Sequence, residues 1–176
     1  MNALTLIQTE QALKHTFFLP NADDTTLLAT SFAAHLSPPS VILLNGPVGA
    51  GKTHFARQLI LADLAKIGQV EDVPSPTFTL VQTYDIGETE IWHADLYRLS
   101  DPSEVYELGL DAAFDTAICL VEWPDRLGEE TPKDALNLTL DIADNDSRTA
   151  TIEWQSPNWN PITKARQRSI DPASDT

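Results

Sequence analysis

Apolar side chains first recur at near-helical spacing between residues 23 and 36. The positions involved are Leu27, Leu28, Phe32 and Leu36. Asn21 or Asp23 can cap the amino end, and Pro38 and Pro39 come after the carboxyl end, where proline cannot continue a helix. The pattern therefore predicts an amphipathic helix that packs one face against the rest of the protein.

Two short runs are apolar without interruption, at residues 41–44 and 117–121. Runs of this length are typical of strands buried on both faces of a parallel sheet. A glycine-rich segment follows the first run, and a helix is expected from near Lys52 to a stop at Gly68. The apolar side of this helix is formed by Phe55, Leu59, Ala62 and Leu64.

A hairpin and a short helix are predicted between these two strands. Residues 77–94 form two β-rich runs around a turn at Gly87, and Asp95 closes the second run. Residues 101–104 then combine a capping aspartate, a proline at the first helical position and a glutamate three residues after the cap. Gly109 is placed to end this short helix.

A second hairpin closes the predicted folded part of the chain. Residues 136–142 alternate apolar and polar positions, turn at 144–146 and return through 149–154, which indicates an antiparallel hairpin at a sheet edge. The Pro-, Asn-, Ser- and Arg-rich residues 156–176 are predicted to be a disordered tail. We therefore expect one domain over residues 1–155, without internal repeats.

The composition agrees with a single cytoplasmic domain. A chain of 176 residues, 42% of them hydrophobic, can bury one substantial core but is short for two. No window approaches the about 18 consecutive apolar residues of a membrane helix, and the first residues lack the pattern of a secretion signal. The single cysteine, Cys119, lies in an apolar run, which favours a buried core residue over a disulfide.

Acidic residues dominate the charge balance. The 11 Lys and Arg against 26 Asp and Glu give a net charge of -15. Such a surface repels the phosphates of nucleic acid, so we expect the chain alone not to bind tRNA or DNA. The surplus acid is interpreted mainly as a means to solubility, with a docking face for a basic partner as the alternative.

The glycine-rich segment after the first apolar run carries the strongest chemical signal. Residues 46–53 match the G-x-x-x-x-G-K-[ST] pattern of a P-loop. The loop contains Gly46, Gly49, Ala50 and Gly51. Its glycines let backbone N–H groups turn inward and approach phosphates closely. Lys52, a solvent-reaching cation in this interpretation, is expected to meet the β and γ phosphates, and Thr53 to offer its hydroxyl to Mg²⁺.

The strand before this loop and the helix after it supply the context that a P-loop requires. The positive amino end of that helix faces the bound anion. We therefore predict an α/β fold of the P-loop NTPase-like type. Its central sheet is expected to be largely parallel, flanked by helices and extended by antiparallel hairpins.

A P-loop also needs an acid that holds Mg²⁺ and polarises water. Glu122 follows the second apolar run, and Asp95 closes the strand that carries His93. Both acids are expected at the carboxyl edge of the sheet, where phosphate binds, and the pattern alone does not rank them. His93 is interpreted as a structural partner in preference to a base.

The nucleotide is expected to be ATP. The chain lacks the guanine-reading N-K-x-D signature and has neither the HRD nor the DFG motif of a protein kinase. Small-molecule P-loop kinases use a mobile lid with several arginines, whereas Arg98 is the only arginine between the loop helix and the second apolar run. An ATPase is therefore favoured, with a small-molecule kinase as the alternative.

Five motifs together resemble the TsaE family, also called YjeE. In chain order they are GAGKT at 49–53, PSPTFTL at 74–80, HADLYRL at 93–99, ELG at 107–109 and VEWP at 121–124. The likeness covers roughly residues 23–154, with the motifs in the family's order. Members of this family are P-loop ATPases of bacterial tRNA threonylcarbamoyladenosine biosynthesis. The resemblance thus implies an ATPase that uses ATP and Mg²⁺.

The resemblance also implies partners. The family works with the TsaB and TsaD proteins, which transfer a threonylcarbamoyl group to the adenosine beside the anticodon. Hydrolysis would reset this partner complex between rounds, and tRNA would be bound only through the partners. A nucleotide-dependent binding module, in which hydrolysis is incidental, is the alternative that the sequence leaves open.

Matching positions imply the roles of individual residues. Those implied are Lys52, Thr53, Thr77, Asp95, Glu122 and Trp123. Thr77 would be a switch-like residue near the γ-phosphate, and Asp95 a Walker-B-like acid. Glu122 would contact Mg²⁺, together with Thr53 and Asp95, and Trp123 would be its neighbour in the site.

Two positions depart from the family pattern. Pro47 and Val48 stand where the family usually has Asp-Leu, and His54 stands where it usually has a second threonine. We still expect His54 to belong to the nucleotide cradle. Because imidazole cannot copy the geometry of a hydroxyl, the hydrolysis rate is expected to differ from the family's even if nucleotide binding does not.

Overall fold

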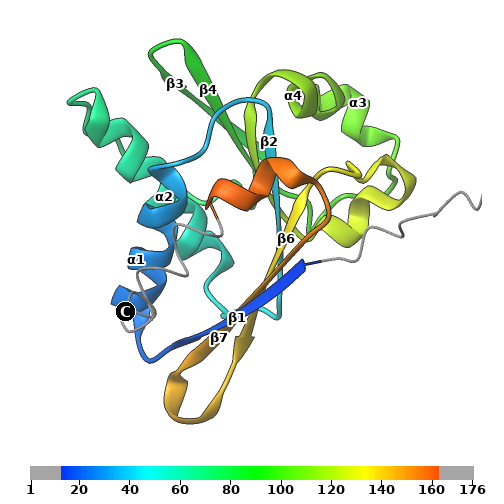
Figure 1. Ribbon diagram of the computed structural model, residues 1–176. Coiled ribbons are helices and arrows are strands. Elements are labelled where there is room, and N and C mark those ends of the chain that lie inside the picture. Colours follow the sequence, from blue (N-terminus) through cyan, green and yellow to red (C-terminus); the bar gives the residue numbers. More distant parts are fainter. Residues whose placement is uncertain (1–12, 163–176) are drawn as a thin grey trace, which may run out of the picture.

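One seven-stranded sheet runs through the centre of the protein (Figure 1). The computed structural model describes residues 13–162. The strands are β1 (Leu13–Leu19), β2 (Ser40–Asn45), β3 (Val81–Ile86), β4 (Thr89–Asp95), β5 (Ile118–Glu122), β6 (Leu136–Ile142) and β7 (Arg148–Trp154). Their order is β1-β7-β6-β2-β5-β4-β3. The four central strands are parallel and the outer pairs antiparallel, which confirms the predicted α/β fold.

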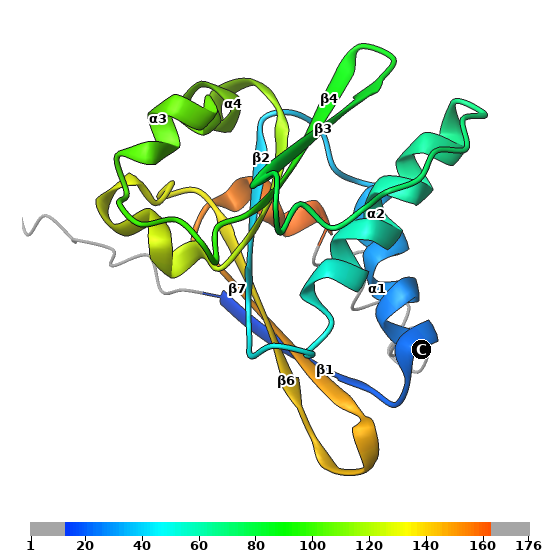
Figure 2. The ribbon, with the colours of Figure 1, turned by 180° about the vertical axis from the view of Figure 1, so that it is seen from behind.

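Helices cover both faces of the sheet, as the two opposite views show (Figures 1 and 2). The helices are α1 (Ala22–Ala33), α2 (Lys52–Lys66), α3 (Glu104–Leu108) and α4 (Leu110–Thr116). Three short 3₁₀ segments are η1 (Pro124–Glu130), η2 (Asp144–Asp146) and η3 (Pro157–Trp159). Helices α1 and α2 lie together on one face, and α3, α4 and η1 lie on the other.

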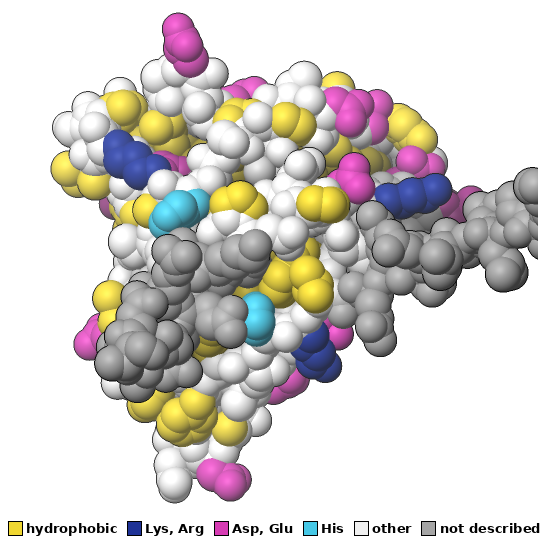
Figure 3. All heavy atoms as spheres, viewed as in Figure 1, with side chains coloured by type: hydrophobic (Ala, Val, Ile, Leu, Met, Phe, Trp, Pro, Cys, Tyr) yellow, Lys and Arg dark blue, Asp and Glu magenta, His cyan; other side chains and the backbone are white. Residues whose placement is uncertain are grey.

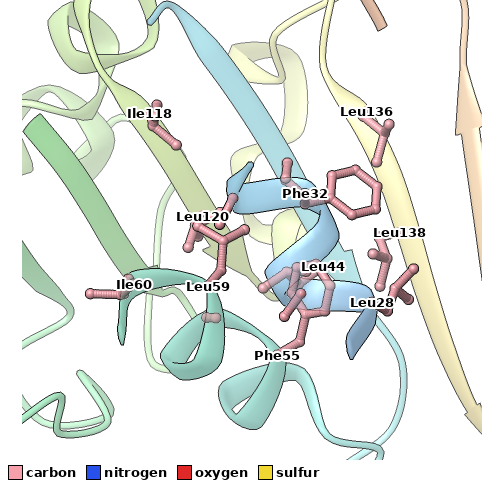
Figure 4. Packing of buried hydrophobic residues seen from close by; sticks show 14 of the residues in the cluster. Leu28, Phe32, Leu44, Phe55, Leu59, Ile60, Ile118, Leu120, Leu136 and Leu138 are labelled. Carbon is pink, nitrogen blue, oxygen red and sulfur yellow. The ribbon is translucent and has the colours of Figure 1, made fainter. Parts of the chain in front are cut away.

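Strand β2 contributes to a hydrophobic core on each face of the sheet. Ile42 and Leu44 belong to the core beneath α1 and α2, whereas Val41 and Leu43 belong to the core beneath α3 and α4. The unbroken apolar run is thus explained by burial on both sides. Figure 4 shows Leu44 packed among side chains of α1, α2 and the neighbouring strands.

Cys119 of β5 is a buried core residue, as predicted. Burial raises the pKa of its thiol to about 12, so the thiolate form is suppressed at neutral pH.

Of the two candidate N-caps of α1, the structure shows Asn21 in this role. The Asn21 side chain accepts hydrogen bonds from the backbone N–H groups of Asp23, at 2.8 Å, and Asp24, at 3.3 Å. The Asp24 carboxylate accepts one in return from the Asn21 backbone, which completes a capping box. The predicted apolar face needs one correction, because Leu27 is 59% exposed whereas Leu28 is fully buried.

The first hairpin begins later than predicted. Residues 77–79 form a turn, and β3 starts at Val81 after Leu80, which has a positive φ of 65°. The turn at Gly87 and the end of β4 at Asp95 agree with the prediction. Strand β4 also pairs in parallel with β5, so the hairpin extends the main sheet.

The short helix α3 begins at Glu104, two residues later than predicted, although Asp101 and Glu104 make the hydrogen bonds expected of the predicted cap. Asp101 accepts from the Ser103 backbone at 2.8 Å, and the Glu104 carboxylate accepts from the Asp101 backbone at 2.9 Å. Gly109, with φ of 78°, ends α3 in the left-handed conformation that favours glycine. Helix α4 follows at once and was not predicted.

The second hairpin does not lie at the sheet edge, so that prediction was wrong. Strand β1 pairs with the outer side of β7, and β6 pairs in parallel with β2. The hairpin is therefore held between the central sheet and an unpredicted edge strand. The side chains of β1 are mostly exposed, and only Leu19 is fully buried. The sequence of β1 therefore lacks the alternation of apolar and polar residues that would predict a strand.

The packed chain also continues beyond Ser156, where a disordered tail was expected. Trp159 and Ile162 are buried in the core beneath α1 and α2. The indole N–H of Trp159 donates to the Asp134 carbonyl at 2.7 Å. Residues 157–162 are thus part of the packed structure, whereas the rest of the predicted tail lies outside the described residues.

The helices of residues 13–162 are all too short or too polar to cross a bilayer.

Candidate functional site

The register of the central strands brings three sequence features to one edge of the sheet. Strand β5 lies between β2 and β4, and Leu44, Glu122 and Asp95 are level with one another across the three strands. The glycine-rich loop leaves β2 just beyond Leu44. The loop and both candidate acids therefore meet at the carboxyl edge of the parallel strands, where α/β proteins bind ligands.

A cavity of about 530 Å³ opens at this edge. Its lining consists of Val48, Gly49, Gly51, Lys52, Thr53, Thr77, Asp95, Tyr97, Glu122 and Trp123. All four residues predicted to be catalytic are among them: Lys52, Thr77, Asp95 and Glu122. Tyr97 was not predicted to belong to the site, and Val48 was predicted only as part of the loop at residues 46–53.

Gly46 is required by a close approach between two backbones. It has φ of 134°, and a Cβ atom at this position would lie 2.1 Å from the Leu140 carbonyl oxygen. No side chain fits against an immovable backbone oxygen at that distance. The start of the loop is thereby packed directly against β6.

Lys52 turns back onto the loop and does not reach solvent, contrary to expectation. The side chain is buried, and its ammonium group donates to the carbonyl oxygens of Gly46 at 2.6 Å and Pro47 at 2.9 Å. It also lies 4.1 Å from the ring centre of Trp123. Burial lowers the pKa of Lys52, against the opposing attraction of Glu122 and Asp95.

Glu122 is held by two partners on its two oxygens. The Thr53 hydroxyl donates to one oxygen at 2.9 Å, and Nε2 of His93 lies 2.8 Å from the other. An ionised carboxylate only accepts, so with Glu122 in that form Nε2 is the donor of this hydrogen bond. His93 is fully buried, and its Nδ1 atom has no hydrogen-bond partner among the described residues. This geometry agrees with His93 as a structural partner.

Asp95 has a different set of partners. One oxygen accepts from the Thr77 hydroxyl at 3.1 Å, and the other accepts from the backbone N–H of Tyr97 at 3.1 Å. Both acids are at most 5% exposed, yet both line the cavity. Glu122 is thus hydrogen-bonded to Thr53 of the P-loop, and Asp95 to Thr77 of the PSPTFTL segment.

Trp123 has an unusual backbone conformation. Its φ of 58° places a bulky side chain in the left-handed region, which is an outlier for such a residue and is often found at functional sites. The conformation sets the indole over the Lys52 ammonium group and against Tyr97, with ring centres 5.1 Å apart. Trp123 thus forms an aromatic wall of the cavity.

Comparison with known proteins assigns this arrangement to a family. The family model described as "Threonylcarbamoyl adenosine biosynthesis protein TsaE" matches residues 19–160. The chain belongs to the TsaE family. The predicted resemblance is thereby confirmed, and the match includes every motif on which it rested.

Individual relatives carry the same family name. A Rickettsia bellii protein is 38% identical over 142 residues, covering 81% of this chain and 96% of its own length. A Bacillus subtilis protein is 36% identical over 133 residues, covering 75% of this chain and 80% of its own. Both are named "tRNA threonylcarbamoyladenosine biosynthesis protein TsaE".

A solved structure has the same fold. The crystal structure of Bacillus subtilis YdiB matches with a TM-score of 0.72 at 24% identity, over 91% of this chain and 98% of that one.

The His54 side chain of this TsaE protein does not line the cavity, so a part for the imidazole in the nucleotide cradle stays a prediction. Its Nε2 atom is 3.0 Å from the Thr26 hydroxyl oxygen and 3.2 Å from the Ala22 carbonyl oxygen. The ring therefore points toward the first turns of α1. In this position His54 links α1 to the start of α2, a structural role that a threonine is too short to copy.

The donor groups of the TsaE site suit Mg²⁺. The Thr53 hydroxyl and the carboxylates of Glu122 and Asp95 are hard oxygen ligands of the kind that Mg²⁺ prefers. No group of three or more His, Cys, Asp or Glu side chains placed to hold a metal ion occurs within residues 13–162.

Proposed function

We propose that this TsaE protein binds and hydrolyses ATP in the cavity and serves tRNA threonylcarbamoyladenosine biosynthesis together with TsaB and TsaD. The observation that carries the proposal is the gathering of the P-loop lysine and threonine with Glu122 and Asp95 around one cavity. Phosphoryl transfer needs this combination of phosphate donors, metal ligands and an acid near the reacting group.

The loop and α2 supply the binding of the phosphates. Backbone N–H groups of the loop and the amino end of α2 form a positive site for anions. Lys52 must release the carbonyl oxygens of Gly46 and Pro47 before its ammonium group meets the β and γ phosphates. This exchange replaces two contacts to neutral oxygens by contacts to charged ones, which are stronger.

Thr53 and Glu122 would hold Mg²⁺, with Asp95 on the neighbouring strand. When bound there, the ion neutralises charge that develops on the phosphate oxygens. The contact of Glu122 with His93 keeps its carboxylate at the cavity floor, because the buried imidazole fixes one of its two oxygens.

In this proposal Asp95 and Thr77 act on the attacking water. The Thr77 hydroxyl donates to Asp95, and both line the cavity. A carboxylate in this position can orient water toward the γ-phosphate, a task that phosphoryl-transfer sites give to a base or water-positioning residue.

The charge of the chain favours indirect contact with tRNA. The net charge of -15 opposes binding to a polyanion. On the face shown in Figure 3, basic side chains lie at separate places and do not form a continuous patch. We therefore propose that TsaB and TsaD hold the tRNA, and that this chain joins them as an ATPase subunit.

A reconstituted modification assay tests this function. TsaB, TsaD, tRNA and a preformed threonylcarbamoyl donor are combined with an excess of tRNA over enzyme, and the modified adenosine is counted. With ATP and this protein, product is expected to exceed the amount of enzyme many times. With an ATP analogue whose β–γ bridge resists hydrolysis, product is expected to stop at about one round per complex. Sustained modification with the analogue would contradict hydrolysis as the reset step.

A further inference from the structure

The β6–β7 hairpin supports the phosphate-binding loop from outside the cavity. Strand β6 supplies the Leu140 carbonyl oxygen against which Gly46 is packed. Strand β7 supplies Arg148, whose guanidinium group donates through Nη2 to the Gly49 carbonyl oxygen at 3.0 Å and through Nε to the Ala50 carbonyl oxygen at 3.2 Å. The hairpin is therefore in contact with the loop at its beginning and at its middle.

Arg148 is itself fixed by the turn that joins the two strands. Its Nη1 atom donates to the carbonyl oxygens of Asp146, at 2.6 Å, and Ser147, at 3.1 Å. The planar guanidinium group thus spans four backbone carbonyls, two in the turn and two in the loop. Such a rigid fork positions what it binds, which a single ammonium group on a flexible chain cannot do.

The Ala50 carbonyl matters because of peptide geometry, whereas the N–H that follows the Gly49 carbonyl donates to the Pro47 carbonyl oxygen at 3.2 Å. In a trans peptide unit the C=O and the following N–H point in opposite directions. Holding the Ala50 carbonyl toward Arg148 therefore directs the Gly51 N–H away from it, and Gly51 lines the cavity. Arg148 itself is not among the described residues that line the cavity.

We propose that Arg148 is a positioning residue, which orients the Gly51 backbone N–H of the phosphate-binding loop toward the cavity by binding the Ala50 carbonyl on the opposite side, while its contact with the Gly49 carbonyl holds the loop in place. The inference rests on the proposed binding of nucleotide in the cavity. Its particular claim is that the fork geometry of Arg148 is needed, and that its positive charge alone does not suffice. Arg148 acts on phosphate through the loop and makes no phosphate contact of its own.

The test compares Arg148→Lys and Arg148→Ala with Lys14→Ala as a matched control. Lys14 lies on the neighbouring strand β1, is exposed, and pairs with Glu153 at 3.5 Å, far from the loop in sequence and outside the site. Melting curves establish that each variant is folded. Amide hydrogen exchange of residues 46–51 is then measured without nucleotide, followed by the Kd for ADP with Mg²⁺ and the kcat and KM for ATP.

In both Arg148 variants the amide hydrogens of the loop are expected to exchange about tenfold faster than in the wild type. The Kd for ADP is expected to rise about tenfold. The KM for ATP is expected to rise similarly while kcat changes less than about threefold, since the loop binds phosphates in the ground and transition states alike. Lys14→Ala is expected to leave all these quantities unchanged.

Two results would overturn the inference. If Arg148→Lys kept the slow amide exchange of the loop and the wild-type affinity for ADP, the positive charge would suffice without the fork geometry. If the amide exchange rates of the loop were unchanged in Arg148→Ala, the loop would not depend on this contact. If the wild type bound no nucleotide, the proposed function would fail. The exchange data, obtained without nucleotide, would still decide whether Arg148 orders the loop.

Discussion

Replacement of Lys52 by alanine is expected to reduce ATP hydrolysis by about 10²-fold or more, because a preorganised positive charge next to the transferred phosphoryl group is lost. Nucleotide binding should weaken less, since the backbone of the loop still meets the phosphates. Lys52 is buried and donates to two loop carbonyls, so the variant should also lose about 1–2 kcal/mol of stability. An ATPase assay and a melting curve on one preparation measure both effects.

Lys66→Ala is the matched control for Lys52→Ala. Lys66 lies in the last turn of the same helix, where it contacts Asp63 and the Ala33 carbonyl oxygen, at the end remote from the cavity. Its removal takes away the same charge and should leave hydrolysis within about twofold of wild type. A folded Lys52→Ala protein with normal ATPase activity would mean that the loop is not the catalytic phosphate cradle.

Replacement of Glu122 by glutamine is expected to lower kcat by about 10²-fold while the Kd for ADP changes less than about tenfold. Glutamine keeps the volume and an oxygen that accepts from His93, but it removes the charge that favours Mg²⁺ beside Thr53. Glu122→Ala should show the same loss of turnover and in addition melt earlier, because it leaves the buried His93 N–H without its acceptor.

Asp95→Asn, tested in parallel, shows how the two acids divide the work. A comparable loss of kcat in both variants is expected if Asp95 orients water while Glu122 serves the metal. Glu130→Gln is the control, since Glu130 accepts from the Tyr106 hydroxyl at 2.7 Å away from the cavity. If turnover in Glu122→Gln equals that of this control, Glu122 is only an acid at the end of a strand.

The features that could be predicted from the sequence depend on neighbours within the chain. The P-loop pattern at residues 46–53, the fully apolar strand β2 and the capping box at Asn21 each involve residues close together, so composition and spacing suffice to reveal them. The predicted site residues likewise converge, because parallel strands with acids at their ends must present them at one edge.

The features that were missed depend on contacts between distant segments. Strand β1 is ordered by pairing with β7, which lies more than a hundred residues away, and its own side chains are largely exposed. The contacts of Arg148 with Gly49 and Ala50 cannot be predicted from the sequence pattern near either segment.

His54 illustrates the same limit within a recognised motif. Its place next to Thr53 predicted a role in the cradle, but the side chain of the third residue of α2 points toward α1, where Thr26 and the Ala22 carbonyl offer hydrogen bonds. Lys52 was expected to reach solvent because no local rule indicates that Gly46, Pro47 and Trp123 surround it. In both cases the sequence does not indicate the direction of a side chain.

The central claim, that the cavity beside Lys52 is an adenine nucleotide site, is tested most directly by calorimetric titration of the purified protein with ATP, ADP and GTP in the presence of Mg²⁺. The account predicts one saturable site per chain for ATP and for ADP, with affinity for GTP at least about tenfold weaker, which corresponds to about 1.4 kcal/mol. Equal affinity for GTP, or no saturable binding of ATP, would contradict it.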